Sequence, residues 1–168
     1  MLTYDFDASV GYWIGMTSHA IRRALSARLN EAGITIRQWE VLAWLACNAN
    51  ASQADLAECL GVEPHTVVGV IGRMERDGWL KRCPCDDDRR RNRLVPTERA
   101  EEVWQRAVEI CQEVRAQAVA GFTPAELSLL KKLCGDIREN LAVPDPVCQP
   151  CEAAAAERAN PAARLALD

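Results

Sequence analysis

WLKRCPCDDDRRRNRLVPT, residues 79–97, lacks helical periodicity and is interrupted by Pro84 and by three consecutive aspartates. Its loose alternation between apolar and polar residues predicts a two-stranded hairpin. Six basic residues fall within 81–93, and six minus the three aspartates leaves a local charge of +3 in a chain whose formal net charge is -4. A basic hairpin in an acidic protein favours a local contact with phosphate groups.

Two short helices joined by a tight turn are predicted directly before this hairpin. Residues 52–60 begin with S-Q-A-D, a variant of the capping box, and Gly61 supplies the left-handed conformation that a tight turn needs. The second helix begins at Pro64, a favourable first position, and ends near residues 77–78. Its predicted apolar side consists of Val67, Val68, Ile71 and Met74. The arrangement is a helix-turn-helix.

Longer amphipathic helices are predicted on both sides of this unit, over residues 7–31, 37–48, 98–120 and, after a capping signal at Thr123, up to 141. The first helix and the last two carry apolar stripes that would remain exposed to solvent in a monomer. We therefore expect these helices to pack against a second copy of the chain. The fold class predicted is mainly α with one small β-hairpin.

Composition excludes several classes of protein. An apolar content of 49% argues against wholesale disorder. No run of about 18 apolar residues suggests a membrane span, and the N-terminal MLTYDFDAS has no signal-peptide pattern, so a cytoplasmic location is expected. A sequence pI of about 5.3 argues against nucleic-acid binding by net charge alone. Any such binding must be local and must depend on shape.

The order helix, helix, helix-turn-helix, basic hairpin and two long helices resembles the winged-helix dimers of the MarR (multiple-antibiotic-resistance regulator) family. The resemblance rests on ITIRQWEVL at 34–42, QADLAECLGV at 53–62 and VIGRMERDGWL at 70–80, and on Asp88-Arg89-Arg90 in the hairpin. It covers about residues 10–141. Leu94-x-Pro96-Thr97 stands where the family usually has L-x-L-T, and neither a C-P-C in the wing nor the cysteine-bearing tail is part of the pattern.

The resemblance implies a homodimeric, sequence-specific DNA-binding regulator, often a repressor, that binds a pseudo-palindromic operator on double-stranded DNA. Residues 1–141 would form a winged helix-turn-helix domain, with the DNA-binding part at 34–97 and the dimerisation helices in 1–33 and 98–141. Residues 142–168 form an Ala- and Pro-rich tail, for which we expect flexibility or partial helicity.

Two groups of residues are candidates for DNA contact. The helix that begins at Pro64 would enter the major groove and present His65, Thr66, Gly69 and Arg73. Arg73 has an alternative role as a structural ion-pair partner of a wing aspartate, and His65 as an exposed residue without DNA contact. In the wing the candidates are Arg89, Arg90, Arg91 and Arg93. Family resemblance favours Arg90 for the minor groove, and the others would neutralise phosphates.

The eight cysteines divide into two sets. Cys47, Cys59, Cys111 and Cys134 lie on or near predicted apolar stripes, where free cysteine packs as a small hydrophobe. The remaining four form two close pairs beside prolines, Cys83 with Cys85 and Cys148 with Cys151. Four thiolates suit a zinc ion or an iron–sulfur cluster that would join wing and tail and sense metal, iron or redox state, with Cys111 as a reserve ligand. Thiol redox switching without a metal, and cysteines with no role in sensing, are the alternatives.

Two further functions are compatible with parts of the sequence. A pocket for a small aromatic or carboxylate effector is implied by the resemblance, with Trp13, His19, Arg23, Trp39 and Trp44 as candidate residues, although tryptophans at helical spacing are more often core residues. A dithiol oxidoreductase that uses Cys148 and Cys151 is the enzymatic alternative. No strand–helix context of the thioredoxin type surrounds that pair, and no other catalytic motif is present, so we predict that the protein is not an enzyme.

Overall fold

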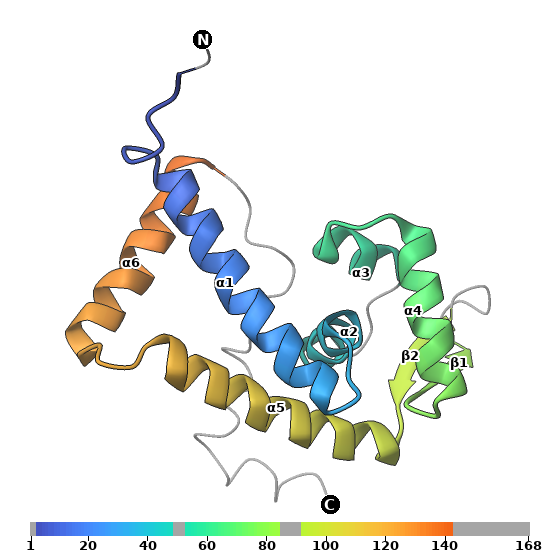
Figure 1. The fold of residues 1–168 in the computed structure, drawn as a ribbon. Helices are drawn as coiled ribbons and strands as arrows, with labels where there is room; N and C mark the ends of the chain where they lie inside the picture. The colour runs from blue at the N-terminus through green and yellow to red at the C-terminus, as the bar shows by residue number, and fades with distance from the viewer. Residues whose placement is uncertain (1–2, 49–52, 85–91, 143–168) are drawn as a thin grey trace, which may run out of the picture.

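The computed structural model describes residues 3–48, 53–84 and 92–142 (Figure 1). In chain order its elements are α1 (Val10–Glu31), α2 (Ile36–Cys47), α3 (Gln53–Leu60), α4 (Pro64–Arg76), β1 (Leu80–Pro84), β2 (Asn92–Pro96), α5 (Glu98–Ala118) and α6 (Pro124–Asn140). The strands form a two-stranded antiparallel sheet. The predicted fold class, mainly helical with one hairpin, is confirmed. No helix among the described residues is both long and apolar enough to span a membrane.

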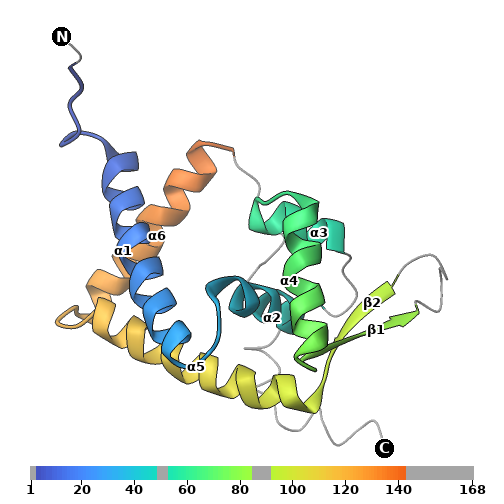
Figure 2. The same cartoon turned by 45° about the vertical axis from the view of Figure 1, so that its right-hand side comes forward.

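The elements form two groups, which are clearest in Figure 2. Helices α1 and α6 lie on the same side of the long helix α5 and converge at their ends away from it, as Figure 1 shows. Helices α2, α3 and α4 and the hairpin make up the second group, at the other end of α5. Helix α5, which belongs to the predicted dimerisation region, therefore runs from the wing to the helices α1 and α6.

Local capping sets the ends of the helices. Helix α1 begins at Val10, later than the residue 7 predicted, because the Ser9 hydroxyl accepts the Tyr12 amide at 3.2 Å and caps it. The preceding residues form a turn in which the Asp5 carboxylate accepts two backbone amides. Helix α2 opens with a capping box between Thr35 and Gln38.

The hairpin is held in one register, with Leu80 opposite Pro96, Arg82 opposite Leu94 and Cys83 opposite Arg93. Because side chains alternate across a strand, Leu80, Arg82 and Leu94 share one face. Leu80 and Leu94 are buried on that face. Cys83 and Arg93 share the opposite face.

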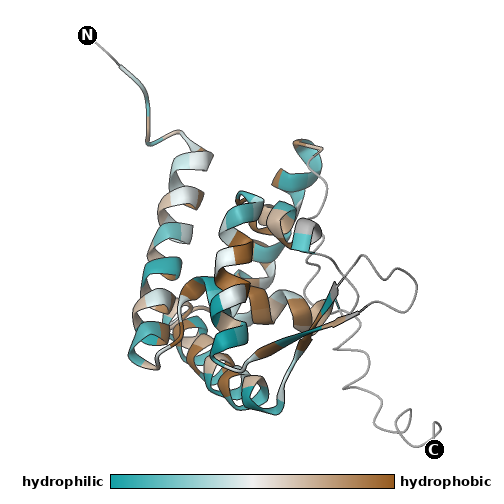
Figure 3. Ribbon diagram, turned by 90° about the vertical axis from the view of Figure 1, so that its right-hand side faces the viewer, coloured by the Kyte–Doolittle hydropathy of each residue, from teal (hydrophilic) through white to brown (hydrophobic). Residues whose placement is uncertain are grey.

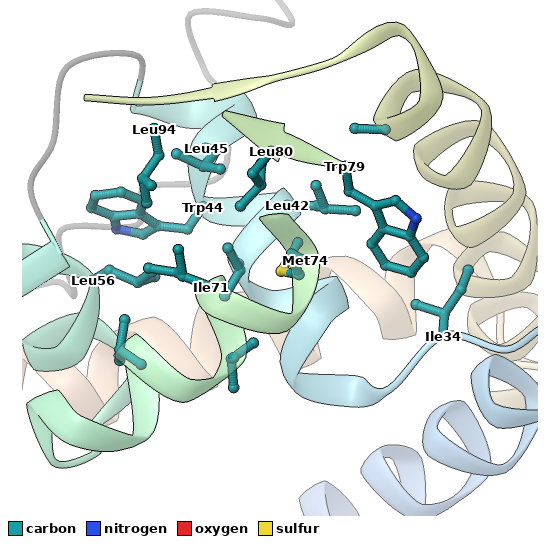
Figure 4. Close-up of a cluster of buried hydrophobic side chains, with 14 of the residues drawn as sticks. Ile34, Leu42, Trp44, Leu45, Leu56, Ile71, Met74, Trp79, Leu80 and Leu94 are labelled. Carbon is teal, nitrogen blue, oxygen red and sulfur yellow. The ribbon is translucent and has the colours of Figure 1, made fainter. Parts of the chain in front are cut away.

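The core lies within the second group of elements, between α2, α4 and the hairpin (Figure 4). Trp44, Leu56, Ile71 and Met74 are almost completely removed from solvent. Figure 3 shows the apolar segments gathered where these elements meet. Burial of each large apolar side chain contributes about 1.5–3 kcal/mol, so this cluster fixes the orientation of α4 relative to the hairpin.

Helix α6 contributes nothing to this core, since none of its residues is buried. In α1, Leu29 is the buried residue. The large apolar side chains that remain exposed on these two helices are Val10, Tyr12, Trp13, Ile14, Met16, Ile21, Leu129, Leu130 and Leu133. An amphipathic helix is stabilised mainly by packing of its apolar face, and within one described chain this packing is missing.

Candidate nucleic-acid interface and adjoining pocket

Helix α4 presents a buried side and an open side. Its buried residues are Val67, Val70, Ile71 and Met74. Three of these were predicted, but Val68 was wrongly placed on the buried side: it is 50% exposed, and Val70 takes the core position instead. Val68 therefore joins the open side as a candidate missed from the sequence, because an exposed methyl pair can contact a thymine methyl group.

The four predicted DNA-contact residues of α4 share that open side. His65, Gly69 and Arg73 are exposed and Thr66 is partly exposed. A side chain added at Gly69 would meet only the end of the Arg73 side chain, at 3.9 Å, so the helix backbone there is open to close approach. Arg73 forms no ion pair with the described residues. The wing aspartates offered as its alternative partner, residues 86–88, lie outside them.

The hairpin is bonded to α4 through β1 and to the turn after α4 through Thr97. On β1 the Arg82 Nε donates to the Glu75 carboxylate at 2.9 Å. After β2 the Thr97 hydroxyl donates to the Gly78 carbonyl at 2.6 Å, and the Thr97 amide donates to the Trp79 carbonyl at 3.0 Å. These bonds fix the root of the wing relative to the helix that precedes it.

The wing arginines are described only in part. Arg93 lies on β2 and is exposed, as are Lys81 and Arg82 on β1. The predicted contacts through Arg89, Arg90 and Arg91 fall on residues 85–91, outside the described part of the chain.

The predicted metal centre is represented by Cys83 alone, which is partly buried on β1. Cys85, Cys148 and Cys151 lie outside the described residues. Within the described ranges no group of three or more His, Cys, Asp and Glu side chains is placed to hold a metal ion. For the reserve ligand Cys111, burial raises the thiol pKa to about 11, which disfavours the thiolate that a metal requires.

The four cysteines interpreted as packing residues differ in their surroundings. Cys47, Cys59 and Cys111 are partly buried, and Cys59 packs against the core. Cys134, in contrast, is exposed on α6. Cys134 lies on the predicted apolar stripe of α6, but no other part of the described chain covers that stripe.

A pocket of about 640 Å³ lies between α1, α2 and α6. It is lined by Trp13, Ile14, Thr17, Ser18, Ile21, Arg22, Leu25, Ile36, Trp39, Glu40, Leu130 and Cys134. Of the five residues predicted for such a pocket, Trp13 and Trp39 line it. Trp44 instead lies in the core, with 1% of its surface exposed. His19 and Arg23 are exposed on α1 outside the lining.

The cation that lines the pocket is Arg22, one residue before the predicted Arg23. One residue rotates a helix position by about 100°, which is enough to move a side chain from the pocket to solvent. The Arg22 Nη1 donates to one carboxylate oxygen of Glu40 at 2.6 Å, and the Arg37 Nη1 donates to the other at 2.8 Å. The side chain of Glu40 is 17% exposed, whereas that of Arg22 is 48% exposed.

Trp39 has a second neighbour on the side of α5. Its ring stacks on that of Trp104, with centroids 4.9 Å apart and planes inclined by 18°. Trp104 in turn borders a small cleft of about 110 Å³ together with Pro96, the last residue of β2. Two stacked indoles thus lie between the pocket and the root of the wing.

Comparison with known proteins finds similarity to transcription regulators. Residues 32–91 match a family model described as MarR family. A variant of MarR from E. coli, solved in complex with operator DNA, superposes with a TM-score of 0.70 at 21% identity, over 82% of this chain and 99% of that one. CouR from Rhodococcus jostii RHA1, solved with p-coumaroyl-CoA bound, gives a TM-score of 0.68 at 18% identity, over 80% and 95% of the two chains.

A structure of the transcriptional regulator PA3341 gives a TM-score of 0.71 at 27% identity, over 80% of this chain and 98% of that one. The segment matched by the family model runs from the start of α2 into the hairpin, and so contains the helix-turn-helix and the first wing strand. The structural matches extend the agreement to the long helices. The chain has the winged helix-turn-helix fold, and its residues 32–91 match the MarR family.

Proposed function

We propose that the chain is a homodimeric, sequence-specific DNA-binding transcription regulator that acts as a repressor. The observation that carries the proposal is the open side of α4, where His65, Thr66, Gly69 and Arg73 lie together, next to a hairpin bonded to the end of the same helix. A helix of this kind enters the major groove with its N-terminal half toward the bases, and a basic wing reaches the adjacent backbone or minor groove. The E. coli MarR variant bound to operator DNA supports this geometry.

Dimerisation is supported by the unpaired apolar surface of α1 and α6. Helix α6 has 17 residues, none of which is buried against the described part of its own chain, whereas isolated helices of this length are marginal in water. Leu129 and Leu133, which do not line the pocket, are each about half exposed. A second copy related by a twofold axis would bury both sets of side chains. Two α4 helices per dimer then read two half-sites of a pseudo-palindrome, about 34–36 Å apart along the DNA.

The DNA-binding proposal is tested with duplexes selected from a random pool by the purified full-length protein. Fluorescence anisotropy then measures affinity at several salt concentrations. We expect Thr66→Ala to weaken binding, with a loss of about 1–3 kcal/mol if Thr66 contacts a base. Arg73→Gln should weaken binding and, if Arg73 contacts phosphate, reduce the salt slope by about one unit. Arg115→Gln, which removes the same charge from the far end of α5, is the matched control. Affinity that is unaffected by both α4 variants would contradict the proposal.

The signal proposed is a small amphipathic effector that binds the pocket between α1, α2 and α6. A cavity of about 640 Å³ with a mostly apolar lining and one charged pair has the size and character of a small-molecule site. The CouR structure with p-coumaroyl-CoA supports effector binding by a protein of this fold. Binding of an effector should release DNA, which the same anisotropy assay measures. An occupied pocket with unchanged DNA affinity would contradict this role.

The cysteine-ligated centre stays a separate prediction from the sequence. Metal and acid-labile sulfide analysis after anaerobic purification tests it directly. Metal-free protein, together with normal DNA binding by a variant in which Cys83, Cys85, Cys148 and Cys151 are all replaced by Ser, would exclude it.

A further inference from the structure

Val68 is an apolar side chain in the middle of the open side of α4. It is 50% exposed, although valine is among the residues most often buried in folded proteins. His65 lies one turn before it and Gly72 one turn after it on the same side of the helix. Val68 is therefore enclosed by residues of the proposed DNA interface, and it is the apolar part of that surface.

No described side chain shields Val68 along this side of the helix. Its neighbours there, Gly69 and Gly72, have no side chain. Apart from the backbone of the helix itself, a Cβ added at Gly72 would meet no atom within 4 Å, and one added at Gly69 would meet only the Arg73 Nη1 at 3.9 Å. The fold therefore has room for alanine at both positions, and alanine would favour the helix. Glycine instead leaves the methyl groups of Val68 above bare backbone, a shape that allows another molecule to approach closely.

The residue types in the N-terminal half of α4 limit which base this helix can read. Residues 64–70 have the sequence PHTVVGV, and this half faces the bases when such a helix lies in the major groove. Arg and Lys pair with guanine, Asn and Gln pair with adenine, and Asp and Glu accept from cytosine. None of these residue types occurs in PHTVVGV. The base feature that an apolar side chain recognises is the methyl group of thymine.

The cations of α4 lie at its other end. Arg73 and Arg76 are exposed in the C-terminal half of the helix. Contacts from such residues to phosphate supply affinity and fix the register of the helix, but they carry no sequence information of their own. The chemistry of the open side thus changes along the helix, from an apolar reading part at Val68 to a basic anchoring part.

We infer that Val68 is a specificity-determining residue, which requires a thymine at one position of each operator half-site through contact with the 5-methyl group. This inference rests on the proposed function of α4 as the DNA-reading helix. Because valine is branched at Cβ, its side chain is held largely in one rotamer within a helix and loses little entropy when a methyl group packs against it. The bare backbone at Gly69 and Gly72 lets the helix come close enough for that contact.

Thymine and uracil differ only in this methyl group, so uracil substitution isolates the contact. The full-length protein first selects duplexes from a random pool, and the selected half-sites should share a thymine at a fixed position. Each dT is then replaced in turn by dU in both half-sites, and fluorescence anisotropy compares the dissociation constants. We expect one position at which dU weakens binding about 15-fold, or about fourfold for each methyl group at about 0.8 kcal/mol. The ratio should not depend on salt, because a lost methyl group releases no counterion.

Three variants assign the ratio to Val68. Val68→Ala should bind the dT and dU duplexes with nearly equal affinity at that position, because the methyl groups that meet the base are absent. Val108→Ala is the matched control, since it removes the same two methyl groups from a partly exposed position on α5, and it should keep the ratio. Gly69→Ala should raise the melting temperature and weaken operator binding, because the added methyl group favours the helix but occupies the space between its backbone and the base.

Several results would overturn the inference. They are a wild-type protein that binds every dU duplex as tightly as the dT duplex, and a Val68→Ala variant that keeps the wild-type ratio. Wild-type operator affinity of Gly69→Ala would reject the close approach of the helix. Selection of a defined sequence with any of these outcomes rejects the role of Val68 alone, whereas selection of no sequence rejects the regulator function as well, so the two failures are distinguishable.

Discussion

The exposed leucines of α6 give a quantitative test of the proposed dimer. Leu129 and Leu133 lie one turn apart and do not line the pocket between α1, α2 and α6. The perturbation that we consider is Leu133→Ala. Alanine has the higher helix propensity, so the change does not weaken the helix itself. Any loss of association must then come from apolar surface that the second copy no longer covers.

The magnitude follows from the exposure of the side chain. Leu133 is 48% exposed in the single chain, so a partner has about half of it left to bury. Complete burial of a leucine contributes about 1.5–3 kcal/mol, which gives about 0.7–1.5 kcal/mol per subunit. A twofold interface contains the residue twice, and the loss doubles to about 1.5–3 kcal/mol. The dimer dissociation constant should therefore rise about 10- to 150-fold.

Sedimentation velocity over a dilution series measures that dissociation constant without DNA. Val68→Ala is the control, because Val68 is 50% exposed but lies on α4, far from α6 in Figure 1. It should leave the dissociation constant unchanged. Leu133→Ala with a wild-type dissociation constant, or a wild-type protein that sediments as a monomer, would refute the argument.

Three further predictions concern caps and thiols. Thr97→Ala should lower the free energy of unfolding in urea by about 1–2 kcal/mol, and by more than Thr123→Ala, because Thr97 both caps α5 and bonds the turn that follows α4. Hydrogen bonds from the Thr123 backbone and side chain lower the pKa of Glu126. The cap therefore stabilises α6 at neutral pH, and this stabilisation is lost as the pH falls through the lowered pKa. Thr123→Ala should raise the pKa of Glu126 in an NMR titration. Iodoacetamide at neutral pH should modify the exposed Cys134 before Cys111, because burial raises the pKa of the Cys111 thiol to about 11. Mass spectrometry measures the two labelling rates, and faster labelling of Cys111 would contradict its burial.

Much of the fold follows from local signals in the sequence. Pro64 at a helix start, the capping residues Thr97 and Thr123, and the change of periodicity after Gly78 each act through the backbone within a few residues. Such signals predicted the helices and the hairpin to within about three residues. The start of α1 and the end of α5 were placed less well, because the turn at residues 5–8 and the last turn of α5 carry no strong signal.

The candidate sites were less predictable, because they depend on how helices rotate against one another. Val68 and Val70 are chemically alike, and only the packing of α4 on the core decides that Val70 is buried. The same is true of Arg22 and Arg23, of which the first lines the pocket. Trp44 and Trp39 lie on one helix, yet one fills the core while the other faces a cavity. Sequence periodicity identifies a helix face to within about one residue, and that margin separates the two outcomes.

The stack of Trp39 on Trp104 gives the protein a built-in optical reporter. Two indoles with ring centroids 4.9 Å apart couple electronically, and the sign and strength of their near-ultraviolet circular dichroism depend on the angle between the rings. One ring belongs to α2 and the other to α5. Any movement of the helix-turn-helix relative to the long connecting helix therefore changes a signal that requires no label.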